Sequence, residues 1–440
     1  MFKDKKTFWH YPELILLSLL LLSRILLFLD RLGTELGWDT GAHLEMVSLY
    51  TWGDLSIDVR ESFYSYHPPF GFLLARTFHL MGLSPLVSVQ ILSFIASLTA
   101  FFFLRATLQK LDFLSSPIGI AFLYITSSIP LQIYLSTSVN LDVLILALAS
   151  VILYCSICIC WKHQKSWELY LGLLTALAAA LLTKFSGWIL LSIPILCALT
   201  KPRGLLDEGL SVLHHIRHPL RSTTLTLLSV LILTFPYYHH RYYATTGTFF
   251  PSNTDTWIGE HREKRDKAPF IFMKNVLLAP KAHAQGTPLE EFSFEGLRLY
   301  DVWNSFWARS TDFIEQSEIS KGLSQLYRTF TPFLMIIGLM IVLCTAYRRS
   351  SYWNRLGIVI LSFTFIQFLA LLWYIYQNPY GDWIPAKAAY IAPAVMGIGF
   401  LLAHSFAPFT HFTPKRTSLQ VALLAGIAIF IIVNHSIPVY

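Results

Sequence analysis

Asp39 and His43 stand four residues apart in a segment that follows the first apolar run of the chain. Aspartate is a favoured residue at the start of a helix, and residues four apart on a helix share one face. A carboxylate beside an imidazole suits general-base chemistry on a hydroxyl group. The same spacing also fits a helix cap followed by a histidine at a membrane interface, so the pattern alone leaves both interpretations open.

A second candidate is His67, which precedes Pro68 and Pro69 at the start of another apolar run. The two prolines fix their own φ angles, and Pro68 biases His67 away from helical geometry. The motif therefore predicts a rigid corner that holds the imidazole just above a membrane helix. A stiff connection into that helix, without any chemistry, explains the prolines equally well.

Charged residues at the ends of apolar runs form a third group of candidates. Lys184 separates two short apolar runs, where an ammonium group is costly unless it meets water or an anion. Such a lysine can hold a phosphate as a point charge, or it can extend to the lipid headgroups. Lys387 precedes a late apolar run and has the same two interpretations. Asp142 begins an apolar run and requires a polar partner or an aqueous cavity, and Arg24 within the first run also requires a partner.

The elements that position these residues are membrane helices. Hydrophobic residues make up 54% of the 440 residues and charged residues 13%, against roughly 25% charged residues in a typical soluble domain. This composition excludes a disordered chain, a collagen-like fibre and an ordinary cytosolic enzyme. The net charge of +7 is typical of basic cytoplasmic loops in a membrane protein and is not taken as a sign of nucleic-acid binding. The five cysteines lie in apolar runs and are expected to be small core residues rather than metal ligands.

A bilayer core of about 30 Å requires about 20 apolar residues in a helix. The sequence predicts an all-α polytopic protein with about eleven such spans, at 13–32, 86–108, 115–134, 139–161, 168–183, 185–200, 223–243, 328–346, 356–376, 389–405 and 418–435. With the N-terminus placed in the cytoplasm, the short cytoplasmic loops hold 15 Lys and Arg residues and the short outer loops hold 3. This asymmetry predicts a cytoplasmic N-terminus and an extracytoplasmic C-terminus.

The expected organisation has three parts. An N-terminal transmembrane module covers 1–243 and contains a first extracytoplasmic loop at 33–85, which carries Asp39 and amphipathic helices. A large extracytoplasmic loop at 244–327 is expected to fold as a cap on the outer membrane surface. The C-terminal transmembrane helices occupy 328–440.

The order of the motifs resembles that of a known superfamily. An Asp-bearing segment follows the first span, His67-Pro68-Pro69 precedes the next, Leu-Leu-Thr-Lys184-x-x-Gly187 separates two short spans, and Lys387-x-x-Tyr390-x-x-Pro393 comes late. This arrangement resembles the GT-C membrane glycosyltransferases. The nearest branch holds the protein O-mannosyltransferases and the bacterial lipid A aminoarabinose transferases, which form a family 39-like group. The predicted order of spans and loops resembles the superfamily over most of the chain, while the matching motifs cover only a small part of the chain.

The resemblance implies a membrane-bound hexosyl- or pentosyltransferase. Such an enzyme takes a sugar from a polyprenyl-phosphate donor and transfers it to a hydroxyl of a lipid, glycan or protein at the extracytoplasmic face. It implies that the acidic residue of the first outer loop, Asp39, is the general base. One base without a covalent intermediate implies inversion at the anomeric carbon. A bacterial inner membrane is the expected location, with membrane lipids around the chain and no nucleic acid as a partner.

The remaining roles follow from the same resemblance. Residues expected to bind the donor phosphate are Lys184, Lys387 and His67, and those expected to bind or position the acceptor are His43, Glu45, Tyr390 and Asp142. The family commonly has a second acid after the first, where this chain has Thr40, and Glu45 is the candidate replacement. It commonly has arginine before the late tyrosine, where this chain has Ala389. No cofactor is expected, and a divalent metal is left open.

Two other functions fit the composition. A transporter or flippase of lipid-linked sugars would place functional charges near mid-membrane and break its helices with Gly or Pro. The candidate residues here cluster at the outer ends of the apolar runs, which favours an enzyme. A non-catalytic relative that serves as an assembly subunit is the third interpretation.

Overall fold

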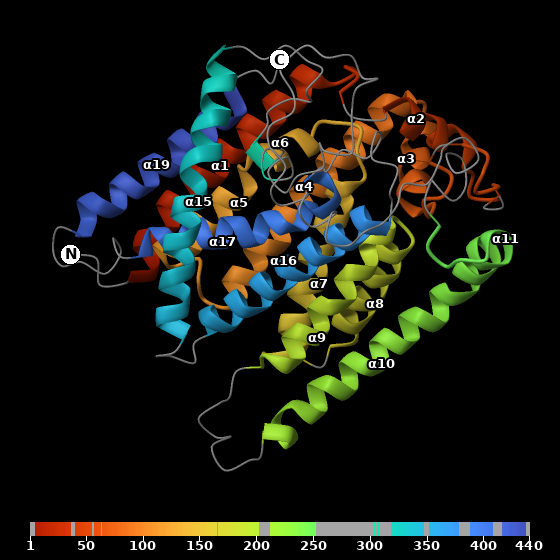
Figure 1. Cartoon of the computed structure of the whole chain (residues 1–440). Coiled ribbons are helices and arrows are strands. Elements are labelled where there is room, and N and C mark those ends of the chain that lie inside the picture. The colour runs from red at the N-terminus through yellow and green to blue at the C-terminus, as the bar shows by residue number, and fades with distance from the viewer. Residues whose placement is uncertain are drawn as a thin grey trace.

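The computed structural model describes residues 5–36, 40–54, 57–62, 64–164, 166–201, 212–251, 303, 306–307, 318–346, 352–377, 388–407 and 416–436. Within these residues the secondary structure is helical, apart from one isolated β-bridge between Thr51 and Asp54 (Figure 1). The elements are α1 (Lys5–Arg31), α2 (Thr40–Leu49), α3 (Phe70–Leu80), α4 (Pro85–Lys110), α5 (Pro117–Ser127), α6 (Pro130–Leu135), α7 (Asp142–Cys160), α8 (Trp167–Leu181), η1 (Phe185–Leu191), α9 (Ser192–Leu199), α10 (Val212–Tyr238), η3 (His239–Tyr243), α11 (Ala244–Thr246), α15 (Glu318–Ala346), α16 (Tyr352–Gln377), η6 (Ala388–Ala394), α17 (Val395–Ser405) and α19 (Arg416–Ser436).

Each apolar segment predicted as a span coincides with helical structure. Six helices are long and apolar enough to cross a membrane, at 11–31, 85–110, 142–160, 219–246, 325–345 and 352–374. The other segments form shorter apolar helices, at 117–127, 167–181, 185–199, 391–405 and 421–435. The all-helical membrane fold is therefore confirmed for the described residues, while the count of eleven spans stays a prediction.

The segment predicted as one span over 115–134 is divided. Ile129 is extended, and Pro130 begins the separate short helix α6. Proline has no N–H to donate and its ring clashes with the preceding turn, so a helix ends before it and the next one begins at it. The segment predicted as the first outer loop, 33–85, contains α2 and α3, whereas most of the predicted large loop at 244–327, and with it the expected cap, lies outside the described residues.

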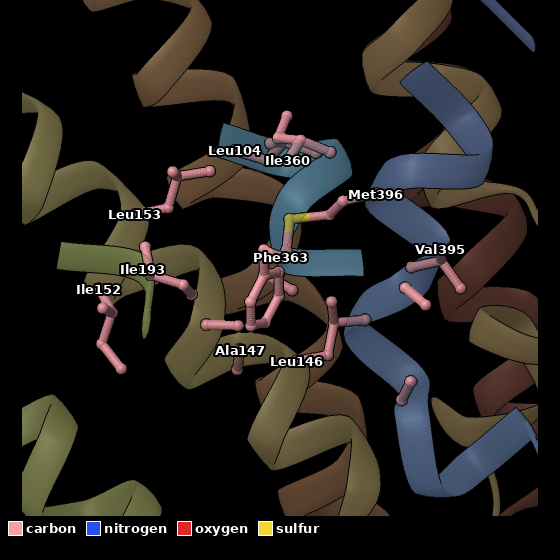
Figure 2. Close-up of a cluster of buried hydrophobic side chains, with 14 of the residues drawn as sticks. Leu104, Leu146, Ala147, Ile152, Leu153, Ile193, Ile360, Phe363, Val395 and Met396 are labelled. Carbon is pink, nitrogen blue, oxygen red and sulfur yellow. The ribbon is translucent and has the colours of Figure 1, made fainter. Parts of the chain in front are cut away.

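The core is built around α7, which is apolar on every side, as expected for a helix surrounded by others. Figure 2 shows Leu146 and Leu153 of α7 among side chains of neighbouring helices, including Leu104 of α4, Ile193 of α9 and Phe363 of α16. In Figure 1, α10 runs along the outside of the bundle next to α8 and α9. Of the cysteines, Cys344 on α15 is exposed and the other four are buried, which corrects the expectation of five core residues.

Two arginine side chains, the buried Arg24 of α1 and the partly buried Arg105 of α4, tie the first helix to the bundle. Arg24 donates hydrogen bonds to the Ser97 hydroxyl of α4 and to the carbonyl of Ser127 at the end of α5. These groups are the partner that the sequence required for Arg24. Nearer the N-terminus, the Arg105 guanidinium of α4 pairs with the buried Glu13 carboxylate, with Nε and Oε1 2.8 Å apart. Helix α1 is therefore held by polar contacts at two levels.

Candidate active site

The ends of three helices meet at residues that the sequence predicts to belong to the active site. The N–H of Phe70, the first residue of α3, donates to the carbonyl of Leu182 just after α8, at 2.8 Å. Gly71 lies so close to the Leu141 and Thr183 side chains that a Cβ there would meet both. The beginning of α3, the beginning of α7 and the end of α8 therefore form one junction, which we call the three-helix junction.

A buried ion pair lies at this junction. The Lys184 ammonium is 2.7 Å from Oδ1 of Asp142, and both side chains are buried. Asp142 begins α7, and its N–H donates to the Asn140 side-chain oxygen at 2.6 Å. The two charges compensate each other in a low-dielectric setting, where either one alone is costly. Lys184 is the polar partner that the sequence required for Asp142.

His67 lies beside this pair in a group of aromatic rings. Its ring centroid is 4.1 Å from that of Tyr66 and 5.1 Å from that of Tyr64, and His43 of α2 stacks on Tyr64 at 4.6 Å. Burial, followed by the charges of Lys184 and His43, holds the pKa of His67 well below its usual 6.5. The imidazole is therefore neutral near pH 7. Its Nδ1 has no hydrogen-bond partner among the described residues.

The backbone at His67 is held by its own turn and by the preceding helix. The N–H of His67 donates to the Tyr64 carbonyl at 2.9 Å. The Tyr50 hydroxyl, just after α2, donates to the His67 carbonyl at 3.3 Å. Burial raises the pKa of Tyr50 to about 12, so its hydroxyl keeps its proton. The rigid corner predicted from Pro68 and Pro69 is present, with α3 beginning directly after it.

Arg241 was not singled out from the sequence, yet it organises this loop. It lies in η3, a short π-helical turn that follows α10. Its guanidinium donates to the Ile57 carbonyl at 2.5 Å, the Ser65 carbonyl at 2.8 Å and the Tyr50 hydroxyl at 2.6 Å. Single π turns inside helices occur often at functional sites. The sequence feature that could have identified Arg241 is its position within a run of aromatic residues at the predicted outer end of a span.

A buried glutamine fixes the end of α1 in the same region. The Gln90 amide of α4 donates to the carbonyls of Arg31 at 3.1 Å and Thr34 at 2.9 Å, and it accepts from the N–H of Gly33 at 2.8 Å. Two residues on, the carbonyl of Leu36 accepts from the N–H of Val139 at 2.8 Å. The chain that leaves α1 is therefore fastened to α4 and to the segment before α7.

The other predicted site residues differ in how they are placed. Glu45 is exposed on α2, and its carboxylate accepts from the Ser62 hydroxyl at 2.7 Å. Asp39 and Lys387 lie outside the described residues, and Tyr390 lies in η6 with its side chain outside them.

The three-helix junction thus brings together Lys184, Asp142 and His67, and the Tyr64 ring lies between His67 and His43. In the part of the chain that is described, no group of three potential metal ligands is present.

Comparisons with known proteins give similarity to solved structures only. No protein-family model matches the chain. No curated protein matches it in sequence. The structure is similar to that of ArnT from Cupriavidus metallidurans bound to undecaprenyl phosphate, with a TM-score of 0.49 and 14% identity over 93% of this chain and 63% of that chain. For apo ArnT the TM-score is 0.40 and the identity 15%, over 94% of this chain and 77% of that one.

The chain therefore spans 63% of the length of the first ArnT structure. Identity and TM-score are both low, and the function proposed below rests on the residues of this chain.

Proposed function

We propose that this chain is a membrane glycosyltransferase that moves a sugar from a polyprenyl-phosphate donor to the hydroxyl of a lipid, glycan or protein acceptor. The observation that carries the proposal is the three-helix junction. Two motifs far apart in the sequence, the His67 corner and the Lys184 segment, are joined there by the hydrogen bond from Phe70 to Leu182. The junction provides a cation, a neutral imidazole and a carboxylate at the ends of membrane helices.

The phosphate of the donor would bind at Lys184. Departure of a lipid phosphate places negative charge on its oxygens, and a positioned cation stabilises that charge. In the structure Asp142 holds the ammonium group at 2.7 Å. Asp142 is therefore the residue that orients Lys184 before the donor arrives. Neutral His67 would donate a hydrogen bond to a phosphate or acceptor oxygen without adding a second charge to the buried pair.

The transfer step has one base and no covalent enzyme intermediate. Asp39 would take the proton of the acceptor hydroxyl, whose oxygen attacks the anomeric carbon as the bond to the phosphate oxygen breaks. The bonding electrons leave with the phosphate, and the configuration of the sugar inverts. Lys387 and Tyr390 remain candidates for the phosphate and the acceptor, with His43 and Glu45 as further acceptor contacts. The loop charges support a site at the extracytoplasmic face, and we infer that the membrane is a bacterial inner membrane.

The proposal is tested with purified protein and a panel of radiolabelled polyprenyl-phosphate sugars. Release of lipid phosphate and transfer of label are measured for the wild type, Asp39→Asn, Lys184→Gln and the control Asp54→Asn. Asp54 is an exposed acid of the same loop. The wild type and the control are expected to turn over, and Asp39→Asn to lose at least about a hundredfold in rate.

Equal rates in the wild type and a well-folded Asp39→Asn variant would remove Asp39 from the mechanism. Saturable donor binding without turnover by any donor would favour the transporter or the non-catalytic relative. Donor translocation in proteoliposomes would then separate these two.

A further inference from the structure

A polar cavity lies at the opposite end of α7 from the three-helix junction. It has a volume of about 510 Å³ and is lined by Ala106, Gln109, Lys110, Tyr154, Lys162 and Gln164. None of these six residues is acidic, and two are cationic. The cavity is formed between the end of α4 and the end of α7, two helices that pack along each other. We call it the basic cavity.

Each helix is followed by a residue with a positive φ and by an N–H that bonds back to a carbonyl near the helix end. After α4, Asp112 has a φ of +64°, and the N–H of Phe113 donates to the Leu108 carbonyl at 2.8 Å. After α7, His163 has a φ of +52°, and the N–H of Gln164 donates to the Cys158 carbonyl at 3.0 Å. The bond after α4 spans five residues, as in the Schellman pattern of helix termination, whereas the bond after α7 spans six residues.

The hydrogen bonds to these two helix-end carbonyls come from backbone N–H groups and not from the side chains of the two lysines. Within the described part of the chain, neither Lys110 nor Lys162 forms an ion pair with a carboxylate. The Lys162 ammonium lies 4.3 Å from the centre of the Tyr352 ring and makes a cation–π contact with it. The basic cavity thus presents two positive charges with two amide side chains beside them.

The position of the basic cavity corresponds to a membrane interface. Helix α7 has 19 residues, which at 1.5 Å per residue is about 28 Å, close to the thickness of a bilayer core. The ion pair of the junction lies at one end of α7 and the basic cavity at the other. The cavity therefore faces the leaflet opposite the junction, which the loop charges predict to be the cytoplasmic leaflet.

Apolar side chains lead from the cavity toward the membrane centre. On α4, Ile95 and Phe102 are exposed and lie on the same helix face as Ala106 and Gln109, because these positions repeat at the helical period. Next to them the Tyr154 ring of α7 packs edge-on against Phe103, with ring centroids 5.6 Å apart. A molecule with a polar head and apolar chains matches this surface.

We propose that the basic cavity binds the headgroup of an anionic phospholipid, with its acyl chains along the exposed face of α4. Basic pockets between membrane helices on the cytoplasmic side bind such headgroups. Lys110 and Lys162 compensate the phosphate charge, while Gln109, Gln164 and the Tyr154 hydroxyl can donate to phosphate and headgroup oxygens. This site is separate from the proposed donor site and does not depend on the glycosyltransferase function.

The test is native mass spectrometry of the delipidated protein titrated with phosphatidylglycerol or phosphatidylcholine. The wild type is expected to bind phosphatidylglycerol about tenfold more tightly than phosphatidylcholine. Lys110→Gln/Lys162→Gln is expected to abolish this preference. Lys201→Gln/Arg355→Gln removes two cations that do not line the cavity, and it is expected to keep the preference. Equal preference in the two double variants would overturn the proposal.

Two further measurements separate lipid from soluble anion and guard against misfolding. Glycerol phosphate, which carries the same head chemistry without acyl chains, is expected not to displace the lipid at equal concentration, and displacement would show a soluble-anion site instead. In the unmodified protein, phosphatidylglycerol is expected to lower amine acylation of Lys110 and Lys162 at least about threefold but not that of Lys201. Unchanged acylation of both cavity lysines would reject the proposed site.

Discussion

The His67 imidazole is buried against Tyr64 and Tyr66, and the Lys184 charge opposes its protonation. In the unfolded chain its pKa is near 6.5, and in the folded protein it is well below that value. Between these two values the unfolded chain binds more protons. The free energy of unfolding therefore falls as the pH drops below about 6.5, by at most about 1.4 kcal/mol per pH unit from this residue.

This pH dependence is measured as the thermal unfolding midpoint of the detergent-solubilised protein between pH 5 and pH 8. His67→Gln is expected to flatten the acid side of the curve, because the variant has no group there that must stay neutral. His79→Gln serves as the control, since His79 is only half-buried and its ring contacts the Leu83 carbonyl. If the unfolding midpoint of His67→Gln depends on pH as steeply as that of the wild type, groups other than His67 cause the dependence.

The Lys184–Asp142 pair leads to a second prediction at the residue scale. Asp142→Asn leaves a buried ammonium group without its counter-charge, and Lys184→Met leaves a buried carboxylate, so each single change should cost about 3 kcal/mol or more. The double variant should cost less than the sum by at least about 1 kcal/mol, because both charges are gone. Denaturation of all four proteins gives this coupling energy. Additive costs would mean that the two groups do not interact.

At the scale of elements, η3 connects the long outer helix α10 to the first outer loop through Arg241. Arg241→Lys keeps the charge but loses the planar fork that reaches the two loop carbonyls and the Tyr50 hydroxyl together. We expect faster hydrogen exchange in residues 57–67 and a rate of sugar transfer lower by about tenfold or more. Arg221→Lys, an exposed position on α10, is the matched control. Unchanged exchange in residues 57–67 would exclude a positioning role.

The sequence predicts the helices of this chain better than it predicts their contacts. Apolar runs of helical length require membrane helices, so the positions of most elements followed directly. Pro130 divides the predicted span at 115–134, because the length of an apolar run does not register a proline that ends one helix and begins the next. The need of Asp142 for a partner was visible in the sequence, but its pairing with Lys184 depends on how α7 and α8 pack. The role of Arg241 depends on a π turn, for which the sequence pattern gives no periodic signal.

At the scale of the whole molecule, the predicted orientation can be tested with cysteine labelling. In a Cys344→Ser background, which removes the one exposed thiol among the described residues, Gly53→Cys and Ser166→Cys are introduced singly. Gly53 lies in the predicted first outer loop with open space around it, and Ser166 lies exposed between α7 and α8. A membrane-impermeant maleimide applied to intact cells is expected to label Gly53→Cys, and Ser166→Cys only after permeabilisation. The opposite pattern would invert the topology and move the candidate active site to the cytoplasm.

The shortness of α8, which the sequence predicts to be a membrane span, has a consequence for the lipids around the protein. Its 15 residues extend about 23 Å at 1.5 Å per residue, while a bilayer core is about 30 Å thick. Trp167 and Leu171 on this helix are exposed, so the shortfall faces lipid. Hydrophobic mismatch of this kind is relieved by local thinning of the bilayer. A thinned annulus beside α8 would bring the headgroup layer closer to Lys184, which shortens the path of a charged lipid phosphate through hydrocarbon.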